Sequence, residues 1–238
     1  MIWWIAATLS AFFVKGLCGF ANTLVFTTVM SFGLNNRDIT PVELLLGYPI
    51  NAIIAFRERK AIDKKLCAML SALVVLGSIP GMLLLKAADT GAVKLLFGVV
   101  IVLLGVEMLL REIKPGRMKE SKGMLAVIGL VSGVLCGLYG VGALLGAYIG
   151  RVAKDASAFR ANICVVFFVE NTLRIAMYCA SGLLTAGMAL QAARLLPFAL
   201  LGLFVGAQSG ARLSAKAAKR VVVLMLVISG ISLILGQI

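Results

Sequence analysis

Residues 123–150 read GMLAVIGLVSGVLCGLYGVGALLGAYIG, an apolar stretch in which a glycine returns every few positions. Each glycine weakens a helix by up to about 1 kcal/mol relative to alanine. A second apolar stretch, residues 2–33, carries the run Lys15-Gly-Leu-Cys-Gly-Phe-Ala-Asn22 in its middle. We therefore expect both stretches to form broken helices or re-entrant hairpins rather than continuous membrane spans.

The composition of the whole chain favours a membrane protein. Of 238 residues, 61% are hydrophobic and only 14% are charged, whereas charged residues make up about a quarter of a soluble domain. A soluble protein of this length cannot bury so much apolar side chain. The sequence thus predicts an all-α polytopic membrane protein. It excludes a secreted disulfide scaffold, a disordered tail and a nucleic-acid binder, because the net charge of +13 fits basic anchors at the ends of membrane helices.

Two absences exclude catalytic and metal chemistry. The chain has no histidine and no CxxC spacing, so it lacks a Ser-His couple, an HExxH motif and the usual zinc ligand patterns. We expect no metal, no cofactor and no enzymatic activity. The five cysteines are interpreted as small apolar packing residues.

A spanning helix needs about 20 mainly apolar residues. Six stretches meet or approach this length: Ile39–Phe56, Leu66–Leu85, Gly91–Leu110, Ala161–Ala180, Leu195–Ala211 and Val221–Ile238.

The distribution of lysine and arginine tests how these stretches cross the membrane. If all eight apolar stretches were spans, the basic residues would divide ten against ten. If the two glycine-rich stretches enter and leave on one face, 17 basic residues fall on one side, in the loops 57–65, 111–122, 151–160 and 212–220. Because basic loops stay in the cytoplasm, this second topology is favoured. It places both termini outside.

This topology divides the chain into two inverted repeats, each with one glycine-rich hairpin and three spans. The predicted first repeat covers residues 1–110, a basic linker covers 111–122, and the second repeat covers 123–238. Residues 17–20 match residues 135–138, at an offset of 118. Three further matches follow in the same order, at offsets that rise to 125: Asn51 with Asn171, Gly77/Gly81 with Gly202/Gly206, and Lys94/Gly105 with Lys219/Gly230.

Inverted repeats with interrupted helices are typical of secondary transporters. Backbone amides freed at a break must face protein, water or a ligand, and a helix N-terminus suits an anion. The two breaks, at about 16–22 and 133–142, are expected to meet near the midplane and form one anion site. Its predicted backbone residues are Gly16, Cys18, Gly19, Gly133, Cys136, Gly137, Gly140 and Gly142.

Polar side chains inside the apolar stretches complete the candidate site. Lys15 either complements an anion or snorkels to the interface. Glu170 and Arg174 lie four residues apart, either as a structural ion pair or with Arg174 as the anion ligand. Asn22, Asn51 and Asn171 offer amide donors to substrate or to neighbouring helices; Asn162 is similar, and Glu43 is a weaker candidate for a proton relay.

The run Gly133-Val-Leu-Cys136-Gly137-Leu-Tyr-Gly140-Val-Gly142 resembles the glycine-rich signature of the TauE/SafE sulfite exporter family. The two-half layout agrees over essentially the whole chain, although Ala21-Asn22-Thr23 stands where the family commonly has further glycines. The resemblance implies export or uptake of small sulfur-containing or organic anions such as sulfite or sulfonates, and export is the direction that we expect. It also implies residence in the bacterial inner membrane.

Two alternatives to a carrier remain open on the sequence alone: an anion channel, and a membrane scaffold whose glycines serve packing only. The chain has no P-loop and thus no ATPase domain of its own. The expected partners are a small anion and the lipid bilayer, not nucleic acid, and a homodimer stays open.

Overall fold

The computed structural model of the chain describes residues 1–31, 36–87 and 122–212, with isolated positions at 34, 99, 102, 106, 224, 227 and 231. The predicted spans Gly91–Leu110 and Val221–Ile238, the linker up to residue 121 and the Lys94/Lys219 match lie almost wholly outside these residues.

The described residues are all-helical, without a strand, as the composition predicts. They form eight α-helices and one short 3-10 helix: α1 Ile2–Cys18, α2 Asn22–Ser31, α3 Asn36–Arg57, η1 Arg59–Ala61, α4 Lys64–Ala87, α6 Lys122–Tyr139, α7 Ala143–Val152, α8 Ala156–Ala180 and α9 Ala186–Arg212.

Four of these helices, α3, α4, α8 and α9, are long and apolar enough to cross a membrane. They coincide with four of the predicted spans. The predicted start of α9 is wrong: the helix begins at Ala186, nine residues before Leu195. The side chain of Thr185 accepts a hydrogen bond from the amide of Met188 at 3.3 Å, so α9 begins at a polar N-cap that hydropathy alone does not register.

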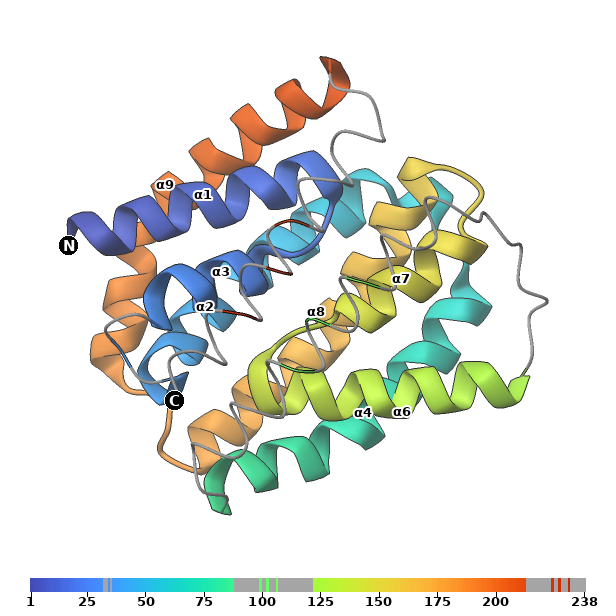
Figure 1. Cartoon of the computed structure of the whole chain (residues 1–238), viewed down its shortest axis with the longest axis horizontal. Helices are drawn as coiled ribbons and strands as arrows, with labels where there is room; N and C mark the ends of the chain where they lie inside the picture. Colours follow the sequence, from blue (N-terminus) through green and yellow to red (C-terminus); the bar gives the residue numbers. More distant parts are fainter. Residues whose placement is uncertain are drawn as a thin grey trace.

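Both glycine-rich stretches are interrupted, and the chain reverses at each interruption (Figure 1). The first break comprises residues 19–21 and the second break residues 140–142. The ring of Trp4, early in α1, lies 5.9 Å from the ring of Phe26 in α2. Since these residues flank the break on opposite sides, α2 folds back along α1. The predicted breaks are confirmed but are shorter than expected.

Each hairpin packs against a helix from the other half of the chain (Figure 1). α1 packs on α9, and α6 packs on α4. α3 and α8 contact one another between these two pairs. The first arms of the hairpins, α1 and α6, therefore lie on opposite sides of α3 and α8, and both breaks meet α3 and α8 at one cavity.

Glycines make both peripheral pairs unusually close. A Cβ at Gly77 or Gly81 of α4 would collide with carbonyl oxygens of α6, and one at Gly133 or Gly137 of α6 would collide with carbonyl oxygens of α4. A Cβ at Gly16, in α1, would likewise collide with the backbone of α9. These glycines allow backbone-to-backbone contact of the kind common between membrane helices. Gly16, Gly133 and Gly137 consequently lie within helices rather than in the breaks.

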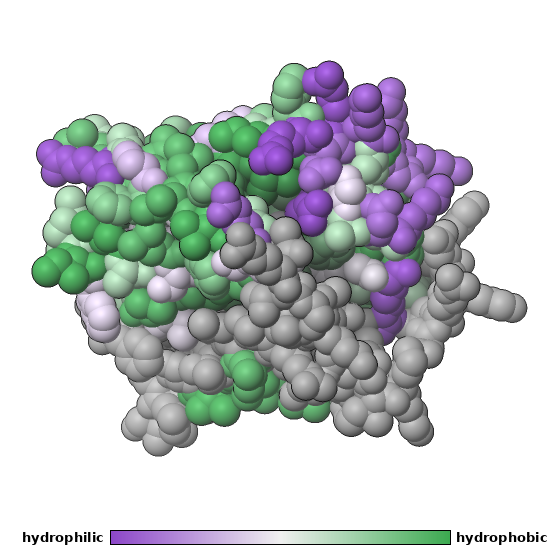
Figure 2. Space-filling view, turned by 90° about the horizontal axis from the view of Figure 1, so that it is seen from above, coloured by the Kyte–Doolittle hydropathy of each residue, from purple (hydrophilic) through white to green (hydrophobic). Residues whose placement is uncertain are grey.

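Two of the predicted basic loops meet at one end of the molecule. Arg160 donates a hydrogen bond to Glu58 at 3.1 Å, and the Ser157 hydroxyl also donates to that carboxylate. Asn162 accepts the backbone N–H of Asp63 at 2.8 Å, which shows that this asparagine joins helices rather than lining a site. Figure 2 shows hydrophilic side chains gathered toward one end of the face in view and apolar side chains over much of the rest. Loops 57–65 and 151–160 thus share a side, as the charge distribution predicts.

Replacing Gly206 by alanine tests the close packing of α9 on α1. A Cβ at Gly206 would collide with the carbonyl oxygen of Phe13, so we expect Gly206→Ala to destabilise the protein by about 1–3 kcal/mol. The matched control is Gly187→Ala in the same helix, where the nearest atom would lie 3.9 Å away. Thermal melting in detergent should show a lower midpoint for Gly206→Ala only; equal midpoints would contradict the packing.

Glu58 gives a pH-dependent prediction at the polar end. The hydrogen bond from Ser157, followed by that from Arg160, lowers the pKa of Glu58 below its ordinary value of 4.5. A lowered folded-state pKa stabilises the fold above the ordinary value, and the stabilisation disappears as the pH falls through the folded value. Glu58→Gln should therefore lower the melting midpoint at pH 7 and have no effect in acid below both values. An unchanged difference across that range would exclude the ionised contact.

Candidate functional site

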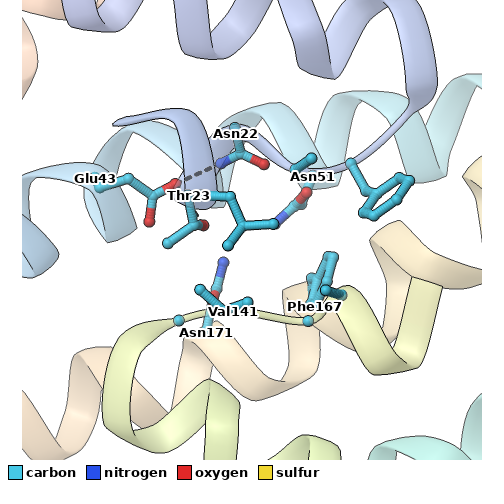
Figure 3. A pocket seen from close by; sticks show the side chains of 13 residues that line it. Asn22, Thr23, Glu43, Asn51, Val141, Phe167 and Asn171 are labelled. Carbon is cyan, nitrogen blue, oxygen red and sulfur yellow. Dashed lines mark hydrogen bonds between the residues drawn. The ribbon is translucent and has the colours of Figure 1, made fainter. Parts of the chain in front are cut away.

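A cavity of about 20 Å³ lies between the two breaks (Figure 3). This volume is enough for about one water molecule. Both breaks contribute to its wall, together with α3 and α8. The lining residues are Phe20, Ala21, Asn22, Thr23, Leu24, Glu43, Asn51, Gly140, Val141, Gly142, Ala143, Phe167 and Asn171.

The starts of α2 and α7 both open on this cavity. Asn22 and Thr23 begin α2, while Gly142 and Ala143 begin α7, and all four line the wall. The N-cap of α7 is Gly142, which has no side chain that could cap the first amides of the helix. Since the first amides of a helix have no partner within it, two positive helix ends point into one small volume.

Left-handed backbone turns the chain at each break. Gly19 has φ +84° and Gly140 has φ +72°, and each donates its N–H to a carbonyl four residues earlier at 2.7 Å. Ala21 also adopts a positive φ, 72°, which costs a residue with a Cβ about 1 kcal/mol. Such strain persists only where surrounding packing enforces it, and Ala21 lines the cavity.

Lys15 lies behind the first break and is 1% exposed. Its ammonium donates to the side-chain oxygen of Asn22 at 3.0 Å and to that of Asn51 at 2.7 Å. The snorkelling alternative is therefore wrong: the charge stays inside the protein. By binding both amide oxygens, Lys15 turns the amide nitrogens of the two asparagines away from itself.

Glu43 is the principal site residue that sequence reasoning undervalued. Its carboxylate accepts hydrogen bonds from the Asn22 amide and, at 2.9 Å, from the Thr23 hydroxyl. Glu43 is 3% exposed and lines the cavity, in the wall that Figure 3 shows above Asn171. An acidic residue in an apolar helix was the available signal, but only the tertiary fold brings it to the start of α2.

Asn51 and Asn171 face the cavity from opposite walls, from α3 and α8 (Figure 3). Among the described residues, the structure gives the Asn171 carboxamide no hydrogen-bond partner, and Asn51 has only Lys15. Two amide groups thus retain donors that a ligand in the cavity can use.

Glu170 and Arg174 form a loose buried pair next to the second break. The Arg174 Nε lies 3.7 Å from the Glu170 Oε1, and neither atom has a hydrogen-bond partner in the part of the chain that the structure describes. The guanidinium also donates to the Tyr178 hydroxyl at 3.5 Å. A Cβ at Gly140 would lie 2.7 Å from its Nη1, so Arg174 sits directly behind the wall that Gly140 forms.

The predicted site residues therefore fall into three groups. Asn22, Asn51, Gly140, Gly142 and Asn171 line the cavity. Lys15, Cys136, Glu170 and Arg174 are buried outside the lining. The remaining residues serve the hairpins: Gly16, Gly133 and Gly137 pack against α9 or α4, Cys18 ends α1, and Gly19 caps it against the side chain of Arg160.

Comparison with known proteins identifies the family. The chain matches the family described as Sulfite exporter TauE/SafE over residues 4–233, nearly its whole length. The chain belongs to the TauE/SafE family. It is accordingly a multi-pass membrane protein of a transporter family and not an enzyme. No curated protein and no solved structure matches it. Within the described residues, no cluster of histidine, cysteine or acidic side chains is arranged to hold a metal ion.

Substituting Gly140 tests the contact between the second break and Arg174. Alanine at Gly140 must adopt φ +72° and also meets the guanidinium. Gly182→Ala is the matched control, because Gly182 has φ +71° with nothing within 4 Å of an added Cβ. Both variants incur left-handed strain of about 1–2 kcal/mol, and Gly140→Ala should lose about 1–3 kcal/mol more. Equal thermal shifts would show that Arg174 yields without cost.

Proposed function

We propose that this TauE/SafE chain is a secondary transporter, an exporter, of small sulfur-containing or organic anions such as sulfite or sulfonates. Transport would cross the bacterial inner membrane, with both termini outside and the loops 57–65, 111–122, 151–160 and 212–220 in the cytoplasm. The observation that carries this proposal is the cavity between two helix breaks, at which two helix N-termini converge.

The chemistry of the cavity wall suits a small oxyanion. Uncapped amides at the start of α7 and the free donors of Asn51 and Asn171 surround one volume. Oxygen atoms of a sulfite or sulfonate accept such hydrogen bonds without a proton of their own. Glycines in the second break allow the ligand to approach the backbone closely.

Arg174 supports the same assignment. In a purely structural buried ion pair, we expect the two side chains to form hydrogen bonds to one another, because an unsatisfied buried charge is costly. In this pair the Nε of Arg174 and an oxygen of Glu170 lack hydrogen-bond partners among the described residues. We infer that a movement at Gly140 lets the guanidinium reach the bound anion, while Glu170 holds it in position.

The two inverted repeats, 1–110 and 123–238 joined by the linker 111–122, form part of the proposal. Support comes from the close backbone contacts, which match between the two helix pairs. A Cβ at Gly77 or Gly81 of α4 would collide with Leu130 or Val134 of α6. A Cβ at Gly202 or Gly206 of α9 would collide in the same way with Leu9 or Phe13 of α1. These contacts align α1 with α6 at an offset of 121 residues, and α4 with α9 at an offset of 125 residues. Gly19 is equivalent to Gly140 in this register, three residues from the alignment that sequence similarity favours.

We infer a carrier rather than a channel because interrupted helices that meet at one site are typical of secondary transporters. The cavity of about 20 Å³ is smaller than a sulfonate, so the surrounding helices must move before such an anion can bind. Saturable counterflow between labelled and unlabelled anion would support alternating access, and single-channel currents would support a pore. A scaffold would show neither.

Arg174→Ala provides the direct test in proteoliposomes. We expect the variant to insert and to lose most anion flux, by about a hundredfold or more if a buried charge-assisted contact of 3 kcal/mol or so is removed. Arg194→Ala is the matched control, because Arg194 is an exposed arginine on α9 and should keep its flux.

Flux of labelled sulfite and methanesulfonate would be compared at equal protein density in the two variants. Normal flux in Arg174→Ala would remove this residue from the mechanism. Absence of flux in the wild type for every sulfur oxyanion and short carboxylate would overturn the proposed function itself.

A further inference from the structure

Among the residues that the structure describes, four charged side chains are buried around the cavity. Each is at most 3% exposed: Lys15, Glu43, Glu170 and Arg174. Two are cations and two are carboxylates, so the cluster is neutral as a whole when all four are ionised. An unbalanced charge in such an environment costs several kcal/mol. An ion that binds in the cavity is therefore expected to leave the total charge of the cluster unchanged.

A monovalent anion that binds in the cavity adds one negative charge to this balanced cluster. The anion brings no counter-ion with it. The balance is restored most simply when one buried carboxylate takes up a proton.

We propose that Glu43 is this proton acceptor, so that each anion bound by the transporter is accompanied by one proton on the Glu43 carboxylate. The inference rests on the proposed function and adds its coupling ion. The step is a proton transfer only: hydronium from the solvent gives up one proton and becomes water as its O–H bond breaks, and the carboxylate gains that proton and becomes a carboxylic acid.

Geometry favours Glu43 over Glu170. Glu43 lines the cavity, whereas Glu170 does not. Both recorded side-chain partners of Glu43, Asn22 and Thr23, donate to the same Oε1. The second oxygen can therefore carry a proton without breaking either hydrogen bond. Glu170 instead faces the Arg174 guanidinium, whose Nε lies 3.7 Å from its Oε1.

The surroundings of Glu43 contain few other groups that can titrate. Lys15 approaches from α1, and Arg174 and Glu170 approach from α8. Cys136 on α6 and Tyr178 on α8 interact with the Arg174 and Glu170 pair. Asp38 on α3 and Arg194 on α9 are exposed. Glu43 is thus the carboxylate best placed to respond to a charge in the cavity.

The two breaks differ in the acidic side chain beside them. At the first break, the side chains of Asn22 and Thr23, which begin α2, donate to the carboxylate of Glu43. At the offset of 120 that pairs Asn51 with Asn171, the residue equivalent to Glu43 is Ile163, which carries no charge. We therefore place the anion nearer the start of α7, across the cavity from Glu43.

Proton uptake can be measured directly on the purified full chain. Methanesulfonate is a suitable probe because it stays a monoanion and carries no proton itself. Titration calorimetry in buffers of different ionisation enthalpy gives the number of protons taken up per anion. We expect about one proton per anion for the wild type near neutral pH, and an affinity that rises up to about tenfold for each unit of falling pH.

Glu43→Gln should bind methanesulfonate with no proton uptake and with affinity independent of pH. Glu43→Asp keeps a carboxyl group and should retain uptake, and Glu58→Gln, which removes a carboxylate from the polar end, should behave as the wild type. Binding without proton uptake in the wild type, or unchanged uptake in Glu43→Gln, would overturn the assignment of Glu43 and leave the proposed function standing. If no sulfonate, sulfite or carboxylate binds the wild type, both proposals fall.

Discussion

A backbone that stops being helical inside hydrocarbon must find partners for its amides and carbonyls, and this requirement shapes the whole molecule. The two breaks answer it in the same way. Each ends a helix on a left-handed glycine that returns its N–H to the preceding turn, and each starts a new helix facing a cavity walled by protein. The interruptions thus bring the starts of two helices to a single place.

The sequence predicted the helical class, four of the spans and both interruptions, because these depend on local composition: long apolar runs, and glycine at a density that a helix does not tolerate. It placed the limits of the breaks less well. Gly16, Gly133 and Gly137 look like helix breakers in one dimension, yet they lie inside α1 and α6 and admit the backbones of α9 and α4. The sequence alone does not distinguish a glycine that interrupts a helix from a glycine that lets a second helix pack closely, because the difference depends on which helix packs against it.

The candidate site shows the same division. Lys15, Asn51 and Asn171 stood out because a polar side chain in an apolar run needs an explanation, and the structure brings them to the cavity or directly behind it. Glu43 is polar in the same way, but its position near the outer end of a predicted span makes it a weaker candidate in the sequence. Its importance depends on the fold-back of α2, which brings Asn22 and Thr23 to its carboxylate and cannot be read from spacing.

The glycine contacts join helices that belong to different halves of the sequence, α1 with α9 and α4 with α6. Backbones in direct contact leave no side-chain layer that could slide or repack. Any motion that opens the cavity must therefore carry α9 along with the first hairpin and α4 along with the second. Two groups of helices would then move as units, α1 and α2 with α9, and α6 and α7 with α4, and each group combines helices from both halves of the chain.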